Sequence, residues 1–351
     1  ADSFWNYTFL EKYFASTDTS SKKKAGISFD LKEVVLKNVS FTKKDGWLGS
    51  DMYVKVGGMA MIARKITLTD KIVDVTNLIL EDPYFSSYNY KGKYVSTSNP
   101  EKIRQEVPSS SPQWKINFGT VSIKNGRFRD DKETMTRTTN AFDGKHIDFY
   151  NINGTLKNIG WLADTVTGNI NLTARERSGF IVKSLKAKTT IHPQAMIFDD
   201  LYLETNHSVL RNHFAMRYNS LGDMSDFLHA VTMEANFDQS TISSDDIAFF
   251  APTLKTWNKN IKIDGKVRGT VDGLSSEDLE VWAGNNTYVR GAVSLVGLPN
   301  INETLINIEA EELRTTYSDA VSFIPAIRGI TTPNLNKLTY LRFKGTYTGF
   351  V

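Results

Sequence analysis

The sequence predicts an all-β protein whose strands pair in antiparallel fashion. Apolar and polar residues alternate in many short stretches, as in 27–32 and 261–272. Alternation with a period of two is typical of a strand with one buried face and one solvated face. Asn, Asp and Gly separate these stretches, so we expect turns at 44–46, 124–126 and 142–144.

One unit of the sequence occurs twice, which predicts a repetitive architecture. The pattern from Asp246 through Phe250 to Pro252 returns from Asp319 through Phe323 to Pro325, roughly 75 residues later. Each copy is followed by an apolar–basic–Gly–Thr phrase, at 267–270 and 343–346. Weaker echoes relate 29–41 to 116–128, and 206–211 to 285–290.

Composition limits the classes of function. The chain has 351 residues, of which 40% are hydrophobic and 23% charged, so it can bury a core. A net charge of +3 is too small to indicate a nucleic-acid partner, and we expect none. Because the chain has no cysteine, it has no disulfides or thiolate metal sites.

No apolar run approaches the roughly 18 residues of a membrane-spanning helix, and Ala1 does not begin a signal peptide. Because the last strand is cut at Val351, we interpret the sequence as a segment of a longer polypeptide, and any anchor or targeting sequence would lie outside it.

Along the chain, an aromatic segment and loop occupy 1–26, a β-repeat region 27–95, a Ser/Pro-rich loop 96–112, and a continued β-repeat region 113–351. Residues 4–14 fit either an amphipathic helix or an edge strand. Two short helices are predicted in the repeated unit. The first begins at Ser244 and buries Ile247 and Phe250, and the second begins near Thr316 or Ser318 and buries Val321 and Ile324.

No pattern for catalysis or metal binding is present. His207 and His213 would share one face of a continuous strand, but no third metal ligand accompanies them. The acid pairs 199–200, 245–246 and 311–312 point to opposite faces of a strand or serve a helix start. Phosphate-binding glycine loops and nucleophile elbows are also missing from the sequence. We expect a non-enzymatic protein without metal or cofactor.

The apolar faces of roughly a dozen strands need cover, and few helices are available to supply it. One solution is a closed sandwich of two sheets, and the other is a bent sheet whose apolar lining is covered by acyl chains. The residues alone leave both solutions open, with the sandwich ahead.

The order of several phrases resembles the AsmA-like superfamily, and within it the TamB family of translocation and assembly module proteins of Bacteroidetes-type bacteria. The phrases that carry this resemblance are 121–130, the run from Phe237 to Gly269, and 279–291. They lie within a resemblance that covers most of the chain from about Ile27 to Val351.

The resemblance implies an elongated, curved antiparallel β-sheet that forms a hydrophobic groove, a bridge-like "β-taco" in the periplasm. It implies an N-terminal inner-membrane anchor, an outer-membrane barrel partner of the Omp85 class, and a role in phospholipid passage and outer-membrane protein assembly. No catalytic residues come with the family. This chain departs from the family pattern because it lacks the anchor and any recognisable C-terminal partner-binding portion.

The sequence hypothesis is therefore a phospholipid conduit whose groove shields acyl chains. Two alternatives remain: a scaffold that pairs outer-membrane strands at a sheet edge, and a closed β-sandwich binding module. The candidate groove-lining residues are the apolar alternates of the repeat strands: Ile261, Ile263, Val267, Val271, Phe343 and Tyr347.

Overall fold

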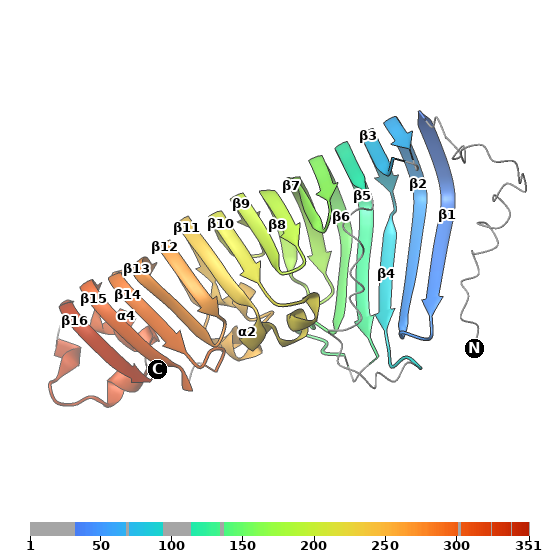
Figure 1. The fold of residues 1–351 in the computed structure, drawn as a ribbon. Coiled ribbons are helices and arrows are strands. Elements are labelled where there is room, and N and C mark those ends of the chain that lie inside the picture. Colours follow the sequence, from blue (N-terminus) through green and yellow to red (C-terminus); the bar gives the residue numbers. More distant parts are fainter. Residues whose placement is uncertain are drawn as a thin grey trace, which may run out of the picture.

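The described chain is a single, long, curved β-sheet, which confirms the predicted all-β fold. The computed structural model describes residues 32–67, 70–93, 114–133, 137–300, 303–323, 325–337 and 339–350. Figure 1 shows the strands side by side, from β1 at one end of the sheet to β16 at the other.

The strands differ in length, and the longest lie in the first half of the chain. They are β1 (Glu33–Asp45), β2 (Ser50–Thr67), β3 (Ile72–Glu81), β4 (Tyr84–Asn89), β5 (Lys115–Lys132), β6 (His146–Leu162), β7 (Thr165–Glu176), β8 (Ile181–His192), β9 (Ala195–Glu204), β10 (Val209–Arg217), β11 (Thr232–Ser243), β12 (Asn260–Thr270), β13 (Gly273–Ala283), β14 (Thr287–Val296), β15 (Leu305–Thr315) and β16 (Leu341–Phe350).

Neighbours in the sheet are neighbours in sequence almost throughout, and they pair antiparallel. The exception is β5, which runs parallel to β3 and β4. β3 and β4 follow one another along the same side of β5, so together they match the length of that strand. All described strands belong to one sheet, and the closed sandwich of two sheets is therefore wrong.

Residues with positive φ bend the strands at several points. Asn38 in β1, Asp82 between β3 and β4, and Asn125 in β5 have φ values of 52°, 49° and 54°. Asn125 Nδ2 donates to Asp82 Oδ1 over 2.6 Å, which ties two bends together. The turn predicted at 124–126 is wrong, because Asn125 takes a left-handed conformation inside a continuous strand.

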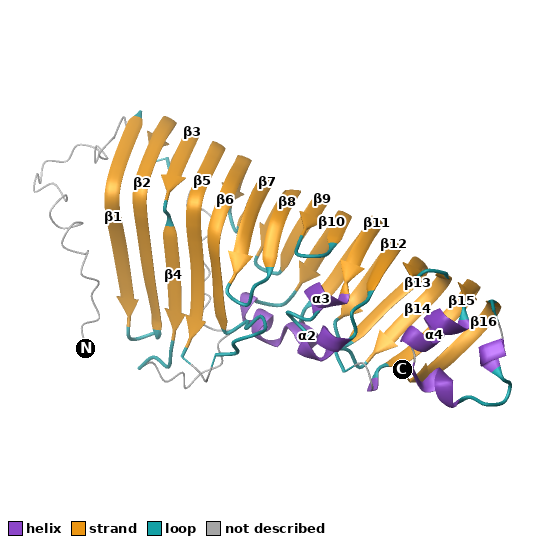
Figure 2. Cartoon of the chain, turned by 180° about the vertical axis from the view of Figure 1, so that it is seen from behind, coloured by secondary structure: helices purple, strands orange, loops and turns teal. Residues whose placement is uncertain are grey.

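Short helices accompany the strand ends (Figure 2). They are the α-helices α2 (Phe227–Ala230), α3 (Ser244–Ile247) and α4 (Tyr317–Phe323), and the 3₁₀ helices η2 (Leu221–Asp226), η3 (Pro252–Thr256), η5 (Pro325–Gly329) and η6 (Leu335–Lys337).

Both predicted helices are present, and their burial is only partly as expected. Ile247 is half-buried and Val321 is buried. The predicted burial of Phe250 is wrong, since the side chain is 45% exposed, although its ring still contacts Phe142 and Phe180. Helix α3 ends before Phe250, so the residue is not on the helix face that the sequence suggested.

The sheet is curved across its width, as contacts between its two margins show. The first margin is where β1, β4, β5, β7, β9, β11, β13 and β15 end. The second margin is where β2, β6, β8, β10, β12, β14 and β16 end. Thr253, from the first margin, donates its hydroxyl to the carbonyl oxygen of Pro299, from the second, over 2.9 Å. Gly144 at the first margin lies close to Met224 at the second. A Cβ added to Gly144 would stand 3.3 Å from the carbonyl oxygen of Met224.

Several expectations concern residues outside the described ranges. These are the 1–26 segment with its possible helix at 4–14, the alternation at 27–31, the 96–112 loop, and the burial of Ile324. Within the described ranges, no helix combines the length and hydrophobicity needed to cross a membrane.

Glycine at position 265 tests the bent-strand geometry. Its φ is +121°, and an added Cβ would lie 2.5 Å from the carbonyl oxygen of Asp278. We expect Gly265→Ala to lower the free energy of unfolding by about 1–3 kcal/mol, measured by urea denaturation. Gly273→Ala is the control, because its nearest neighbour is a hydroxyl at 3.5 Å. Equal stability of the two variants would contradict this account.

Candidate functional site

The candidate site is one apolar face that runs the length of the sheet. Directly paired residues of neighbouring strands project from the same face, so the register identifies rows of side chains. One row crosses the sheet from β1 to β10, and a single glycine interrupts its apolar side chains at β6. Its members are Leu36, Met59, Leu80, Ile123, Gly154, Leu172, Leu185, Leu203 and Leu210.

A second row continues on the same face through the last five strands. Its members are Ile263, Val281, Val289, Leu313 and Phe343. The two rows meet in one hydrophobic cluster, which holds Leu210 from the first row and Ile263 from the second, around Phe237. We call the face that carries these two rows the apolar face.

The opposite face is polar along β12, whereas in β1 and β3 it also carries the exposed apolar side chains Val35 and Ile79. In β12, Lys262, Lys266 and Arg268 are exposed, whereas Ile263 is 6% exposed and Val267 is half-buried. All described strands lie in one sheet, so within the described ranges no second sheet covers Ile263. Side chains of neighbouring strands, gathered in the cluster around Phe237, pack against Ile263 and shield it.

The structure brings five of the six candidate lining residues to the apolar face. Ile263 and Val267 belong to the central cluster, and Ile261 pairs with Ile242 of the same cluster. Phe343 ends the second row. Tyr347 pairs with Ile308, which pairs with Val293 of the cluster.

Val271 does not lie in the strand where the sequence placed it. It lies in the connection between β12 and β13, because β12 ends at Thr270. The alternation that placed Val271 in the lining extended the strand one residue too far. Ile263 is also a core residue, so a charge there would disturb packing as well as any lining role.

The repeated aspartate has a structural role that the sequence did not reveal. Asp246 accepts hydrogen bonds from the backbone N–H of His207, at 3.0 Å, and from the hydroxyl of Thr205. Asp319 accepts from the backbone N–H groups of Asn285 and Asn286, at 3.1 and 2.7 Å. Each aspartate thus anchors the turn of a neighbouring hairpin, which explains why 206–211 and 285–290 also resemble each other.

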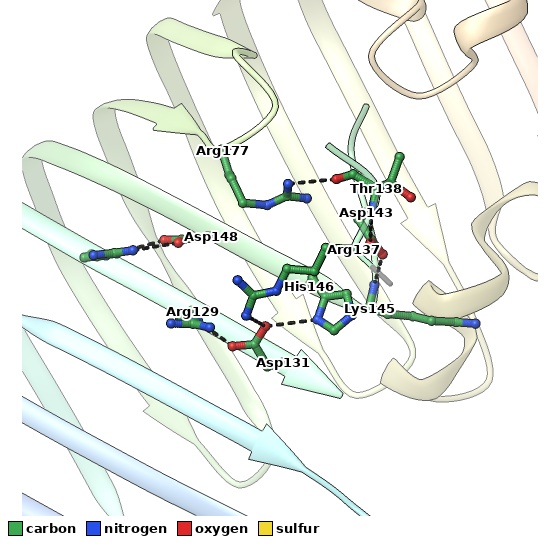
Figure 3. A network of polar contacts seen from close by, with 10 residues as sticks. Arg129, Asp131, Arg137, Thr138, Asp143, Lys145, His146, Asp148 and Arg177 are labelled. Carbon is green, nitrogen blue, oxygen red and sulfur yellow. Dashed lines mark hydrogen bonds and ion pairs between the residues drawn. The ribbon is translucent and has the colours of Figure 1, made fainter. Parts of the chain in front are cut away.

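A network of charged side chains lies where β5 ends and β6 begins (Figure 3). Asp131 forms ion pairs with Arg129 and with Arg137, the latter at 3.0 Å, and its Oδ1 lies 3.0 Å from His146 Nδ1. Asp148 binds Arg127 through two bonds of 2.9 and 2.7 Å. These contacts secure the long strands at one margin.

The pKa of Asp131 lies below its ordinary value. Burial alone would raise this pKa, but hydrogen bonds from His146 and Arg129, and the charges of Arg129 and Arg137, outweigh burial. Asp143 behaves in the same way, because backbone N–H groups of Thr138 and Lys145 donate to it and lower its pKa against the effect of burial.

The two histidines that suggested a metal site have separate positions. His207 lies in the connection before β10 begins, and His213 Nδ1 lies 2.6 Å from Asp199 Oδ1. The described part of the chain contains no group of three or more His, Asp or Glu side chains placed to hold a metal ion.

Comparison of the chain with models of known protein families, with curated protein sequences and with solved structures finds no match.

Asp246 gives a test of the anchoring role. Asp246→Ala removes the acceptor of His207 and Thr205 from a site where the aspartate is only 5% exposed. We expect a loss of about 2–3 kcal/mol of unfolding free energy and faster hydrogen exchange at the His207 amide. Asp245→Ala is the matched control, because it leaves Asp246 in place. Unchanged exchange at His207 in Asp246→Ala would show that the bond does not hold the turn.

Asp131 gives a test that depends on pH. Because its pKa is lowered in the folded chain, the ionised carboxylate stabilises the fold above its unfolded pKa, and this stabilisation is lost as the pH falls through the folded pKa. We expect Asp131→Asn to lower the melting temperature at about pH 7, and the difference from wild type to shrink at about pH 3. A difference that is the same at both pH values would contradict an ionic role.

Proposed function

We propose that the apolar face binds the acyl chains of phospholipids and that the protein serves as a non-enzymatic conduit for them. The observation that carries this proposal is the continuity of the two apolar rows from β1 to β16. An acyl chain is long and uniform, so it needs a continuous apolar surface rather than a pocket of fixed shape.

The physical gain comes from removing methylene groups from water. Each methylene that moves from water to an apolar surface contributes about 0.8 kcal/mol. The polar headgroup stays in solvent. Since the side chains along the two rows are mostly aliphatic, a chain can move along the face without a large barrier and without a cofactor.

We further propose that the conduit operates in the bacterial periplasm, between an inner-membrane anchor outside this segment and an outer-membrane partner of the Omp85 class. The resemblance of the repeat phrases to the AsmA-like superfamily supports this location and partner. The elongated, curved sheet agrees with the shape that the resemblance implies.

The test is mass spectrometry of organic extracts from the protein purified without detergent from a bacterial envelope. We expect phospholipid in stoichiometric amounts with the wild-type chain. Val267→Asp places a charge on the apolar face and should lower bound lipid several-fold, because a buried charge is costly beside acyl chains.

Lys266→Asp is the matched control, since Lys266 is the adjacent exposed residue on the polar face. If Val267→Asp folds poorly, Phe343→Ser with Tyr347→Ser tests the same face at side chains that are 38% and 39% exposed. Equal lipid in folded variants and control would contradict binding at the apolar face.

A second candidate function is the pairing of strands from an outer-membrane protein at the edge of the sheet. Within the described ranges, β16 pairs only with β15, so its other side offers backbone groups for a further strand. Extracts of well-folded wild-type protein that contain no lipid would favour this candidate over the conduit.

A further inference from the structure

The turn between β1 and β2 displays two large apolar side chains at the first margin of the sheet. Trp47 is 55% exposed and Leu48 is 64% exposed. They occupy the tip of a hairpin, where neither residue can join a strand pair. Large side chains exposed in adjacent positions on a tip are unusual for a turn, which normally carries small or polar residues.

This turn is held in one conformation by backbone contacts. Leu48 N donates to Asp45 Oδ1 over 2.9 Å, and Gly49 N donates to Asp45 O over 2.7 Å. Gly49 has a φ of +74°, and a Cβ there would lie 2.0 Å from the carbonyl oxygen of Tyr90. Lys93 N donates to Gly46 O over 3.1 Å, so the segment after β4 supports the turn. These contacts hold the tip in one conformation, with the side chains of Trp47 and Leu48 exposed.

Three exposed lysines lie near the tip, and Asp51, which pairs with Lys44 across the hairpin, is half-buried and accepts a hydrogen bond from Tyr90. Lys44 precedes it on β1, and Lys91 and Lys93 lie on the supporting segment, all three exposed. The acid nearest in sequence, Asp45, is 6% exposed and accepts bonds within the turn. Exposed lysines beside exposed Trp and Leu match the chemistry of an anionic membrane surface, where indole rings sit at the headgroup level.

A hollow of about 470 Å³ lies beside the same segment. The backbone N–H of Lys91 donates to Glu133 Oε2 over 2.8 Å, which joins the segment to the wall of the hollow. Lining the hollow are Tyr88, Arg129, Asp131, Lys132, Glu133, Arg137 and His146. The three cationic side chains of the lining outnumber its two carboxylates, Asp131 and Glu133. Asp131 pairs with both arginines, but a guanidinium has five N–H donors and binds phosphate oxygens well.

We propose that this corner of the sheet docks onto a bilayer of anionic phospholipid. Trp47 and Leu48 enter the boundary between headgroups and acyl chains, the three lysines contact the charged surface, and the hollow receives the phosphate of one lipid headgroup. Docking at this corner does not require that the apolar face carry lipid, so the two proposals can fail separately.

The test is flotation of the whole 351-residue chain with vesicles of phosphatidylcholine, with and without about one third phosphatidylglycerol. We expect the wild-type chain to float preferentially with the anionic vesicles. Trp47→Ser with Leu48→Ser should lower the bound fraction about tenfold, because two apolar side chains no longer insert. Binding equal to wild type would overturn the proposal.

The control for the tip is Leu162→Ser at the end of β6, next to the turn that leads to β7. Leu162 is 59% exposed and also follows a tryptophan, but it lies at the other margin of the sheet. We expect this variant to float like wild type, with Leu48→Ser alone showing a loss. Equal losses in the two single variants would overturn the assignment to the β1–β2 corner.

The hollow is tested separately by Lys132→Gln with Arg137→Gln, which leaves Arg129 paired with Asp131. Phosphatidylcholine and phosphatidylglycerol both carry a phosphate, so we expect this double variant to bind vesicles of either composition less tightly than the wild type. The preference for phosphatidylglycerol should remain, because the three lysines at the tip are unchanged. Binding to both vesicles equal to that of the wild type would overturn the assignment of a lipid phosphate to the hollow.

Discussion

The register of the strands is the constraint on which the rest of this structure depends. In a sheet, a slip of one residue moves every side chain of a strand to the other face. Leu80 of β3 faces Ile123 of β5 even though these strands run parallel, and Phe343 of β16 faces Leu313 of β15 after an irregularity in the register. The apolar face thus persists through a change of strand direction and through bulges.

Curvature follows from the need to shield a face that no second sheet covers within the described ranges. A flat sheet would leave residues such as Ile263 in water, whereas Ile263 is 6% exposed here. Left-handed residues such as Asn125 bend the strands, and the bond from Thr253 to Pro299 links the two margins. The repeated aspartates add rigidity at the first margin, because each secures the turn of an adjacent hairpin. Short-range polar contacts at the strand ends therefore support the long-range apolar continuity.

The sequence could predict the faces of strands far better than their bends. Alternation at Ile261, Ile263 and Val267 was enough to place them together, because period two is a local property. It could not show that β12 stops before Val271, nor that Asn125 bends a strand instead of making a turn, since Asn suits both conformations. The repeat identified Asp246 and Asp319 as a matched pair. Their partners, the turns of adjacent hairpins, lie far away in sequence, so the role itself needed the tertiary structure.

A closed core and a lipid-bearing surface favour different side chains on the outermost strands of a sheet. A core gains nothing from large apolar side chains at an edge, where they remain in water, and edge strands usually carry charge or end early. Here the outermost described strands still place Leu36 and Phe343 on the apolar face, 36% and 38% exposed. Their exposure is costly in an isolated sheet. Their exposure becomes favourable when apolar material lies along the face, which is the condition that the proposed conduit would create.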